Sequence, residues 1–488
     1  MTLPKPVLRL AESVRDAGGR ALLIGGAVRD RLLQRRPTDF DIEVYGLAPQ
    51  VVSDIADTLG TAKDVGKAFG VLEVRPSERR SAEAGAKADL TLHISLPRRE
   101  SKVAPGHRGF AVGVDPAMTP EDAARRRDFT MNAIAEDPLT GDILDPMQGR
   151  ADLENGILRV VDGEHFGEDP LRVLRAAVFA AQFELTIDPD SEKIIRATVP
   201  SLHDLHRERI GEEWRKLLTR PVQPSRGLAL LMDWGVFNVL HPEFHALAGT
   251  QQNSAWHAEG DVWTHTRLAV DVAAQLVREQ QFDADTQWIV LLATLCHDLG
   301  KATTTVERDG VLRSAGHDAA TVKPTRTFLT AIAAGKKTTE CVVRLVREHL
   351  QPLHFSQAQK QGERVGDGRF VALARRLSPA TLFLLSLVAE ADHRGRGTSP
   401  EAETPALVAE FRARAEALGM LHAVPEPILT GADLAALGIP SGPIYGTILR
   451  AAERLREEHD MTREDLLAQL KGANDAQDVL KRLKMLRS

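Results

Sequence analysis

The sequence predicts an α+β protein in which a small α/β head is followed by a much longer all-helical part. Short apolar runs that end in turns and lead into helix-compatible segments are confined to residues 1–140. After residue 136 the strand signals fade, and helical periodicity continues almost to the end of the chain. With 488 residues, 43% of them hydrophobic, the chain has enough apolar side chains for several domains with separate cores.

The first strand and turn of the head lie at residues 21–33. An apolar run at residues 21–24 ends in Gly25 and Gly26, and helix-compatible residues follow. Glycine allows backbone N–H groups to approach phosphate oxygens closely, and the positive end of the following helix adds to the attraction. The pattern therefore predicts a turn that can bind a triphosphate.

The second strand, residues 40–45, alternates apolar and acidic residues. A period of two places Asp39, Asp41 and Glu43 on one face of the strand. Two carboxylates so placed can hold Mg²⁺, which activates a hydroxyl and neutralises phosphate charge during in-line displacement. A lone D-x-D is more often an exposed acidic face, but the nearby Gly-Gly turn favours the metal site. Asp39 and Asp41 are thus the candidate catalytic residues.

Two further segments carry nucleotide-binding chemistry. In residues 124–133, Arg126 and Arg127 suit phosphates and ribose, because guanidinium makes bidentate contacts with oxyanions. Asp128 and Asn132 can meet ribose hydroxyls.

In residues 168–176, helical spacings of three place three polar residues on one face. An Asp on that face accepts the exocyclic amine of cytosine or adenine, and an Arg donates to the neighbouring ring acceptor, so CTP and ATP fit. An N-capped helix with an intrahelical ion pair explains the spacing equally well. The residues concerned are Asp169, Arg172 and Arg175.

The helical part contains a second set of metal-binding residue types. His265, the pair His297-Asp298, and Asp392 occur on separate predicted helices. A single histidine on a helix is usually structural. Imidazoles and carboxylates from several helices, however, form an open divalent site that can activate water for phosphoester hydrolysis.

Five motifs in the first half resemble the class II tRNA nucleotidyltransferases, which comprise CCA-adding enzymes and bacterial poly(A) polymerases. They occur in family order and cover most of residues 20–220. The resemblance implies a polymerase β-like head that binds the nucleotide through Gly25, Gly26, Arg29 and Arg126–Arg127, and a protein-templated choice of base by Asp169 and Arg172. The motifs are GGAVRDRLL with DFD, ARRRDFTMNA, DPMQGRADL, EDPLRVLRA and ERIGEEWRKLL.

The run LLATLCHDLGK at residues 291–301 resembles the HD phosphohydrolase signature. This resemblance implies phosphatase, 2′-nucleotidase or 2′,3′-cyclic phosphodiesterase activity with a divalent transition metal or Mg²⁺. Lys301 would lie near the phosphate, and His317 and His349 could support it or a second metal. The implied ligands are His265, His297, Asp298 and Asp392.

The resemblance also predicts four parts. Residues 1–140 form the nucleotidyltransferase head, residues 141–225 a helical neck with the base-recognition helix, and residues 226–397 an HD-type domain. Residues 398–488 form a helical tail that contacts tRNA, because residues 428–455 are similar to the tail of these enzymes. The expected partners are the tRNA 3′ end, CTP and ATP, with no obligate protein partner.

One departure from the family concerns His93, which stands where many relatives have an acidic residue. Histidine is a poor ligand for Mg²⁺, so Glu73 and Asp89 are alternative candidates for a third acid. Residues 73–110 are long enough to retain the flexible segment that CC-only enzymes lack, which favours complete CCA or A addition. CC-only, A-only and poly(A) synthesis, and an HD hydrolase with an RNA-binding head, remain alternatives.

Composition is typical of a cytoplasmic enzyme. There is no apolar run of membrane-spanning length and no signal-peptide core, and two cysteines fit a reducing compartment. A net charge of −6 excludes a globally basic nucleic-acid binder but not local tRNA contact by the basic stretches 98–108, 125–127 and 481–487. A mobile insert is expected at 73–88 and a linker at 395–405.

Overall fold

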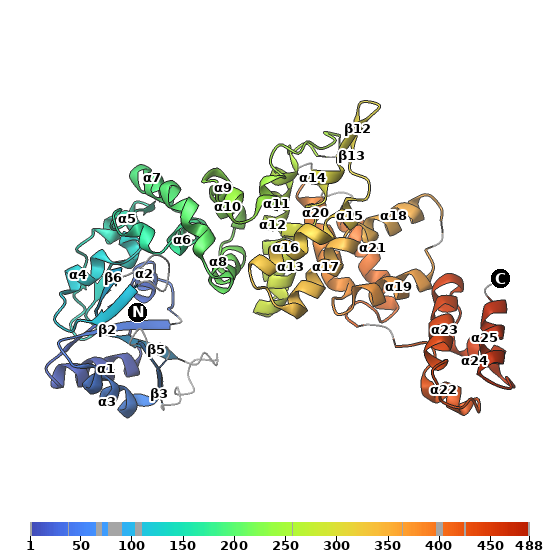
Figure 1. Cartoon of the computed structure of the whole chain (residues 1–488), viewed down its shortest axis with the longest axis horizontal. Coiled ribbons are helices and arrows are strands. Elements are labelled where there is room, and N and C mark those ends of the chain that lie inside the picture. Colours follow the sequence, from blue (N-terminus) through green and yellow to red (C-terminus); the bar gives the residue numbers. More distant parts are fainter. Residues whose placement is uncertain are drawn as a thin grey trace. The chain divides into compact units, whose positions relative to one another are not determined.

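The computed structural model describes residues 2–37, 39–64, 71–76, 90–102, 110–255, 257–363, 365–396, 404–423 and 426–486. Most of the predicted insert at 73–88, Asp89 and residues 397–403 of the predicted linker lie outside the described residues. The chain divides into two compact units, Met1–Glu213 with Leu230–Leu240, and Trp214–Ala229 with His241–Ser488. The first unit contains the main sheet and the second is largely helical, which confirms the predicted α+β class (Figure 1).

The described strands of the first unit form a seven-stranded sheet with the order β3-β4-β5-β2-β1-β8-β9. β2 and β5 run parallel, and the other neighbours run antiparallel. A separate pair is formed by β6 (Arg98–Lys102) and β7 (Phe110–Val114). The strands of the main sheet are β1 (Arg20–Ile24), β2 (Asp39–Tyr45), β3 (Gly60–Asp64), β4 (Val71–Pro76), β5 (Thr91–Ser95), β8 (Ala135–Glu136) and β9 (Ile143–Leu144).

One face of this sheet is covered by α1 (Lys5–Asp16) and α3 (Pro49–Leu59), which lie together in Figure 1. The apolar residues of β2, namely Phe40, Ile42 and Val44, are buried in this core. Because side chains alternate along a strand, the acidic residues of β2 project from the opposite face. The predicted alternation of this strand is therefore confirmed.

The remaining elements of the first unit build a helical layer beyond the sheet. Phe129 is fully buried and makes edge-to-face contacts with Phe166 and Phe179, with ring centroids 6.0 and 5.8 Å apart. The elements are α2 (Gly26–Leu32), α4 (Pro120–Arg125), η1 (Thr130–Asn132), α5 (Gly149–Glu154), β10 (Ile157–Leu158), η2 (Phe166–Glu168), α6 (Leu171–Phe183), β11 (Thr186–Ile187), α7 (Pro189–Thr198), η3 (Val199–Asp204) and α10 (Val236–Val239). Two further helices, α8 (Arg207–Thr219) and α9 (Pro224–Asp233), have residues in both units.

The second unit is built around α13 (Ala284–Cys296), whose residues from Trp288 onward are all buried. It packs against α12 (Val262–Glu279), α17 (Lys336–Glu348) and α20 (Leu382–Arg394). The surrounding elements are α11 (Pro242–His245), α14 (Lys301–Thr304), the hairpin β12 (Val306–Arg308) and β13 (Val311–Arg313), α15 (His317–Ala320), α16 (Val322–Ala331), α18 (Gln351–Lys360), α19 (Asp367–Leu377) and α21 (Thr404–Ala417).

The last helices of the chain have a core of their own, which includes Leu434, Ile448, Leu455 and Leu466. This core starts at Ile428, whereas α21, at the start of the predicted tail, packs against α18 and α20. The helices around this core are α22 (Gly431–Ala436), α23 (Tyr445–His459), α24 (Arg463–Leu470) and α25 (Ala476–Met485).

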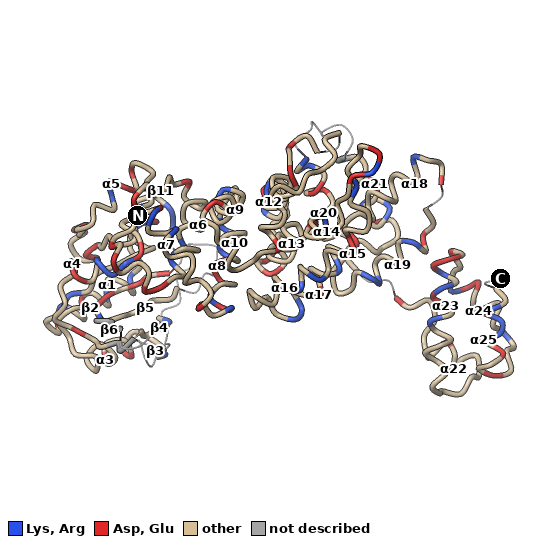
Figure 2. Tube along the Cα trace, turned by 45° about the horizontal axis from the view of Figure 1, so that its top comes forward, with Lys and Arg blue, Asp and Glu red and all other residues tan. Residues whose placement is uncertain are grey.

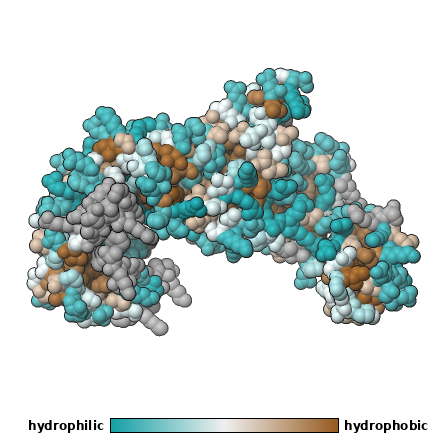
Figure 3. Space-filling model, viewed as in Figure 1, coloured by the Kyte–Doolittle hydropathy of each residue, from teal (hydrophilic) through white to brown (hydrophobic). Residues whose placement is uncertain are grey.

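The surface is mixed in charge. Figure 2 shows Lys and Arg interspersed with Asp and Glu in both units. Figure 3 shows a mostly hydrophilic surface on the viewed face, with a hydrophobic spot on the β12–β13 hairpin, where Val306 and Val311 are exposed. Among the described residues no single helix has the length and apolar composition of a membrane span; α19 and α20 pass that test only as a pair bent by 91°.

Gly149 of the DPMQGRADL motif lies against the backbone of Thr130 in the ARRRDFTMNA motif, and this close approach generates a stability prediction. A Cβ atom at this position would lie 1.9 Å from the carbonyl oxygen of Thr130. Gly149→Ala is therefore expected to lower the free energy of unfolding by about 1–3 kcal/mol, because the backbone must shift. Gly167→Ala is the control, since its Cβ meets only Thr198 Oγ1 at 3.9 Å. Urea unfolding followed by circular dichroism measures both, and equal stabilities would contradict the prediction.

Candidate functional site

The Gly-Gly turn forms the floor of the first candidate site. Gly25 has φ 66° and ψ −130°, a conformation that favours glycine, and α2 begins at the next residue. A Cβ atom at Gly25 would lie 3.8 Å from a guanidinium nitrogen of Arg127 and 3.9 Å from Oδ2 of Asp41. The turn, a carboxylate and an arginine therefore converge at one place, as nucleotide binding requires.

The candidate metal carboxylates Asp39 and Asp41 lie on the sheet face opposite the core. The Asp41 side chain is 49% exposed, and its Oδ1 lies 3.3 Å from Nδ1 of His93. In the strand register His93 pairs with Asp41 on one side and with Glu73 on the other, and such neighbours share a face. Accessible carboxylate oxygens in this arrangement fit a hard cation such as Mg²⁺.

Glu43, the third acid of β2, has a different environment. It is buried, it accepts a 2.6 Å hydrogen bond from the Tyr45 hydroxyl, and its Oε2 lies 3.5 Å from Arg127. Burial and the Glu43 carboxylate raise the pKa of Tyr45, so this hydroxyl stays protonated and donates. Glu43 therefore holds Arg127 beside the turn, a role that the alternation of β2 did not reveal.

Four predicted nucleotide-binding residues form a network inside the first unit. Arg29 is buried and donates to Oδ1 of Asn132 at 2.8 Å. Asn132 donates to Asp128 at 3.0 Å, and Arg175 Nε donates to the other Asp128 oxygen at 2.7 Å. Burial alone would raise the pKa of Asp128, but Arg175 and the neighbouring donors hold it below its usual value. The network ties α2, η1 and α6 together, and nucleotide contact by these residues stays a prediction.

Asp169 does not share a helix face with Arg172 and Arg175, because it precedes α6. Its backbone is extended, with φ −123° and ψ 94°, since a residue before proline avoids the helical region. The alternative interpretation predicted an ion pair between Asp169 and an arginine of the same helix. The structure gives Asp169 a different partner. Instead Arg209 of α8 pairs with both carboxylate oxygens, at 3.2 and 2.8 Å.

Arg172 is held by backbone carbonyls. Its guanidinium donates to the carbonyl oxygen of His165 at 3.1 Å and to that of Arg126 at 3.0 Å. Asp169 and Arg172 are therefore each fixed by neighbouring elements. The role of Arg209 was not predicted, although the residue belongs to the ERIGEEWRKLL motif.

The second candidate site brings together the four predicted metal ligands in the second unit. His265 comes from α12, His297 and Asp298 directly follow α13, and Asp392 comes from α20. Nε2 of His265 lies 3.3 Å from Nε2 of His297 and 3.1 Å from Oδ1 of Asp392. Nε2 of His297 lies 3.2 Å from Oδ2 of Asp298, and all four residues are buried.

The contacts of the Nδ1 atoms of His265 and His297 explain why a cation fits between the two Nε2 atoms. Nδ1 of His265 lies 2.9 Å from Glu259, and Nδ1 of His297 lies 2.7 Å from the carbonyl oxygen of Thr294. These acceptors place the imidazole protons on Nδ1, which leaves both Nε2 atoms as bare acceptors. Imidazole nitrogen and carboxylate lone pairs thus converge here. Lys301 contacts Asp298, and Arg396 lies 3.5 Å from Oδ1 of Asp392, at the edge of the cluster. The converging acceptors form a set that can bind a divalent cation.

A second group of acceptors adjoins the first and shares Asp298. Oδ1 of Asp298 lies 3.4 Å from Nε2 of His317, and His349 completes the group. Within the part of the chain that the structure describes, Nε2 of His349 has no hydrogen-bond partner. Burial, with His297 and His317 nearby, lowers the pKa of His349 to about 4, so it is neutral and able to bind a metal at pH 7. Lys301 Nζ lies 2.7 Å from Oδ2 of Asp298.

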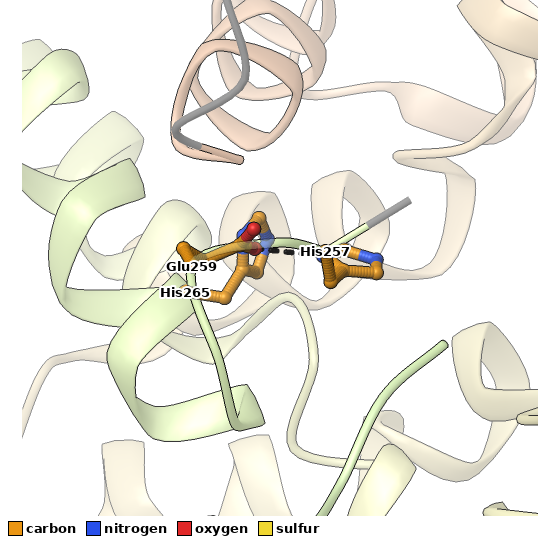
Figure 4. A group of neighbouring side chains, drawn as sticks. All are labelled: His257, Glu259 and His265. Carbon is orange, nitrogen blue, oxygen red and sulfur yellow. Dashed lines mark hydrogen bonds and ion pairs between the residues drawn. The ribbon is translucent and has the colours of Figure 1, made fainter. Parts of the chain in front are cut away.

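A pocket of about 490 Å³ opens beside these groups. Its described lining includes cationic and imidazole side chains, an apolar wall and amides, but no carboxylate. Figure 4 shows His257, Glu259 and His265 as neighbouring side chains, and His257 is part of the pocket lining. The lining consists of Gln252, Asn253, His257, Lys301, Val311, Leu312, Arg313, Ser314, His317, Leu353, Gln357, His393 and Arg396.

Two family models match the chain, one in the head and one in the region that follows it. The family model described as "Poly A polymerase head domain" matches residues 21–159. The model described as "Probable RNA and SrmB- binding site of polymerase A" matches residues 184–247.

Curated relatives cover most of the chain. A "Multifunctional CCA protein" of Xanthomonas euvesicatoria pv. vesicatoria is 36% identical over 435 residues, which are 88% of this chain and 96% of the relative. A protein of the same name from Xylella fastidiosa is 33% identical, over 79% of this chain and 86% of the relative.

Solved structures share the fold. The CCA-adding enzyme of Bacillus stearothermophilus in complex with CTP is similar with a TM-score of 0.63 and 24% identity, over 96% of this chain and 97% of that one. The Thermotoga maritima CCA-adding enzyme complexed with tRNA gives a TM-score of 0.56 and 17% identity, over 95% and 93% of the two chains.

Proposed function

The chain belongs to the class II family of CCA-adding enzymes and bacterial poly(A) polymerases, and we propose that it adds the 3′-terminal CCA of tRNA from CTP and ATP without a nucleic-acid template. The observation that carries this proposal is the convergence of Gly25, Asp41 and Arg127 in the head. The name of the curated relatives, and the CTP and tRNA bound in the similar structures, support the same substrates.

In this mechanism the head positions the triphosphate and the RNA end. The Gly25-Gly26 turn and Arg127 bind phosphate oxygens, and Glu43 keeps Arg127 aimed at the turn. Asp39 and Asp41 would hold Mg²⁺, which supplies charge neutralisation and activation of the 3′-hydroxyl. A network of hydrogen bonds holds α2, η1 and α6 together next to this site. It consists of Arg29, Asn132, Asp128 and Arg175. Positioning and electrostatics then provide most of the rate acceleration.

Base selection is assigned to Asp169 and Arg172, whose side chains are fixed by Arg209 and by backbone carbonyls. A fixed carboxylate acceptor and a guanidinium donor match the edges of cytosine and adenine and mismatch those of uracil and guanine. In the proposed domain organisation these residues lie in the neck, 141–225. The tail, 398–488, contacts tRNA and the HD-type domain spans 226–397.

The two groups of histidine and aspartate side chains in the second unit support a second activity. They fit one or two divalent cations, and their nitrogen-rich donor set favours a transition metal over Mg²⁺. A bound metal there would supply an activated water for phosphoester hydrolysis. The carboxylate-free pocket beside the cluster, with Lys301 and Arg396 in its wall, is suited to an anionic ester. We therefore assign to this site a phosphohydrolase activity on 2′-phosphate or 2′,3′-cyclic phosphate ends, which would restore the hydroxyl that the head extends.

Replacement of Asp41 tests the head. Asp41→Ala is expected to lower nucleotide addition by about 100-fold or more, because it removes a carboxylate that the metal requires. Asp57→Ala, which removes an exposed carboxylate of α3, is the control and should add nucleotides at the wild-type rate. Single-turnover addition to a tRNA transcript measures both. Wild-type rates in the Asp41 variant would refute the assignment.

Replacement of Asp169 tests base selection. Asp169→Ala is expected to reduce the preference for CTP and ATP over UTP and GTP by about 10- to 100-fold, the value of a hydrogen bond to a charged group. Binding of tRNA should change less. Competition among the four nucleotides measures the preference, with Asp190→Ala on α7 as control. An unchanged preference would remove Asp169 from the base-reading role.

A double replacement tests the hydrolase site. The double variant His297→Ala, Asp298→Ala is expected to lower metal-dependent hydrolysis of a 2′,3′-cyclic nucleotide by about 100-fold or more. It removes one metal ligand from each of the two acceptor groups. The same dipeptide occurs exposed at His203-Asp204, so replacement of that pair is a matched control. Full phosphodiesterase activity in the His297-Asp298 variant would exclude this site as its source.

A further inference from the structure

The segment that precedes α12 contributes two residues that no motif assigned. Glu259 is buried, with its side chain 2% exposed. Its Oε1 lies 2.8 Å from Nδ1 of His257 and 2.9 Å from Nδ1 of His265 (Figure 4). One carboxylate oxygen thus contacts a metal-ligand histidine and a histidine of the pocket wall.

We propose that Glu259 is a positioning residue of the second site, which orients the metal ligand His265 and at the same time places His257 to contact the substrate in the pocket. The proposal rests on the metal-dependent hydrolase function assigned above. It adds two residues to that site and specifies how each acts.

The orienting role follows from the two nitrogens of His265. Nε2 faces His297 and Asp392, so it must carry the lone pair if the ring is to bind a metal. Oε1 of Glu259 lies 2.9 Å from Nδ1, so the carboxylate favours the tautomer with the proton on Nδ1 and restrains the ring through this contact. A carboxylate in this position also makes the imidazole a stronger ligand, and its removal typically costs about 10- to 100-fold in metal affinity.

The substrate-contacting role follows from the same chemistry at His257. Its Nδ1 faces Glu259, which leaves Nε2 as a hydrogen-bond acceptor, and the residue lines the pocket together with Lys301 and Arg396. An acceptor beside cationic groups is complementary to a phosphoester that carries a neighbouring hydroxyl. The ribose of an RNA end that carries a 2′-phosphate has this combination, so His257 is suited to accept a hydrogen bond from the 3′-hydroxyl while the cations face the phosphate.

Metal binding separates the two roles. Titration of the metal-stripped full chain with Mn²⁺ by calorimetry is expected to show about 10- to 100-fold weaker binding for Glu259→Gln than for wild type. His257→Ala should bind Mn²⁺ within about twofold of wild type, since His257 orients the substrate and not the metal. Raised Mn²⁺ should restore hydrolysis in the Glu259 variant, a rescue that a merely structural defect would not show.

Kinetics on 2′-AMP, whose 3′-hydroxyl is free next to the 2′-phosphate, complete the test. His257→Ala is expected to raise KM severalfold with saturating Mn²⁺, and an unchanged KM would overturn the substrate contact. Glu243→Gln is the matched control, because Glu243 is a buried carboxylate 3.7 Å from His241 and outside the described metal-binding groups. Wild-type Mn²⁺ affinity in Glu259→Gln would overturn the orienting role. A wild-type chain that binds no divalent metal would instead overturn the hydrolase site itself.

Discussion

The head depends on one constraint, which is that side chains of a strand must alternate between two faces. In β2 this places Phe40, Ile42 and Val44 in the core and leaves the acidic residues no alternative but the opposite face. Burial of three large apolar side chains favours the native register strongly, since a shift by one residue would expose all of them. The energy of the core thereby fixes the position of Asp41 beside the Gly25 turn.

In the second site, too, the packing of the apolar core determines where the chemically active side chains lie. His265 and Asp392 come from α12 and α20, which pack on the buried helix α13, and His297 and Asp298 directly follow α13. The apolar core therefore determines how closely the imidazoles approach. The hydrogen bonds at each Nδ1 then determine which nitrogen faces the centre. Lys301 and Arg396 contact the two aspartates, but the Nε2 atoms of His265 and His297 face each other at 3.3 Å. Two facing nitrogen lone pairs are unfavourable without a cation between them, and this cost is the physical basis for assigning a metal to the cluster.

Local sequence patterns predicted the α+β class and the alternation of β2, because each of these has a local period. The four convergent residues of the second site were implied by the resemblance to the HD phosphohydrolases, since His265 and Asp392 lie 127 positions apart. Tertiary partners were not predictable in this way. The pairing of Asp169 with Arg209 joins residues forty positions apart, and the extended backbone at Asp169 depends on Pro170. Glu259 was missed because a single acid before a helix carries no signal until its two histidine partners are seen in space.

The central claim, addition of CCA by the head without a nucleic-acid template, is tested most directly by incubating the purified chain with tRNA transcripts that end before CCA, after C, and after CC. Labelled CTP or ATP and Mg²⁺ are supplied, and products are resolved at single-nucleotide length. The account predicts that each transcript is completed to CCA and that extension stops there. Long A tails, addition of only C or only A, or no extension despite phosphoester cleavage, would contradict it.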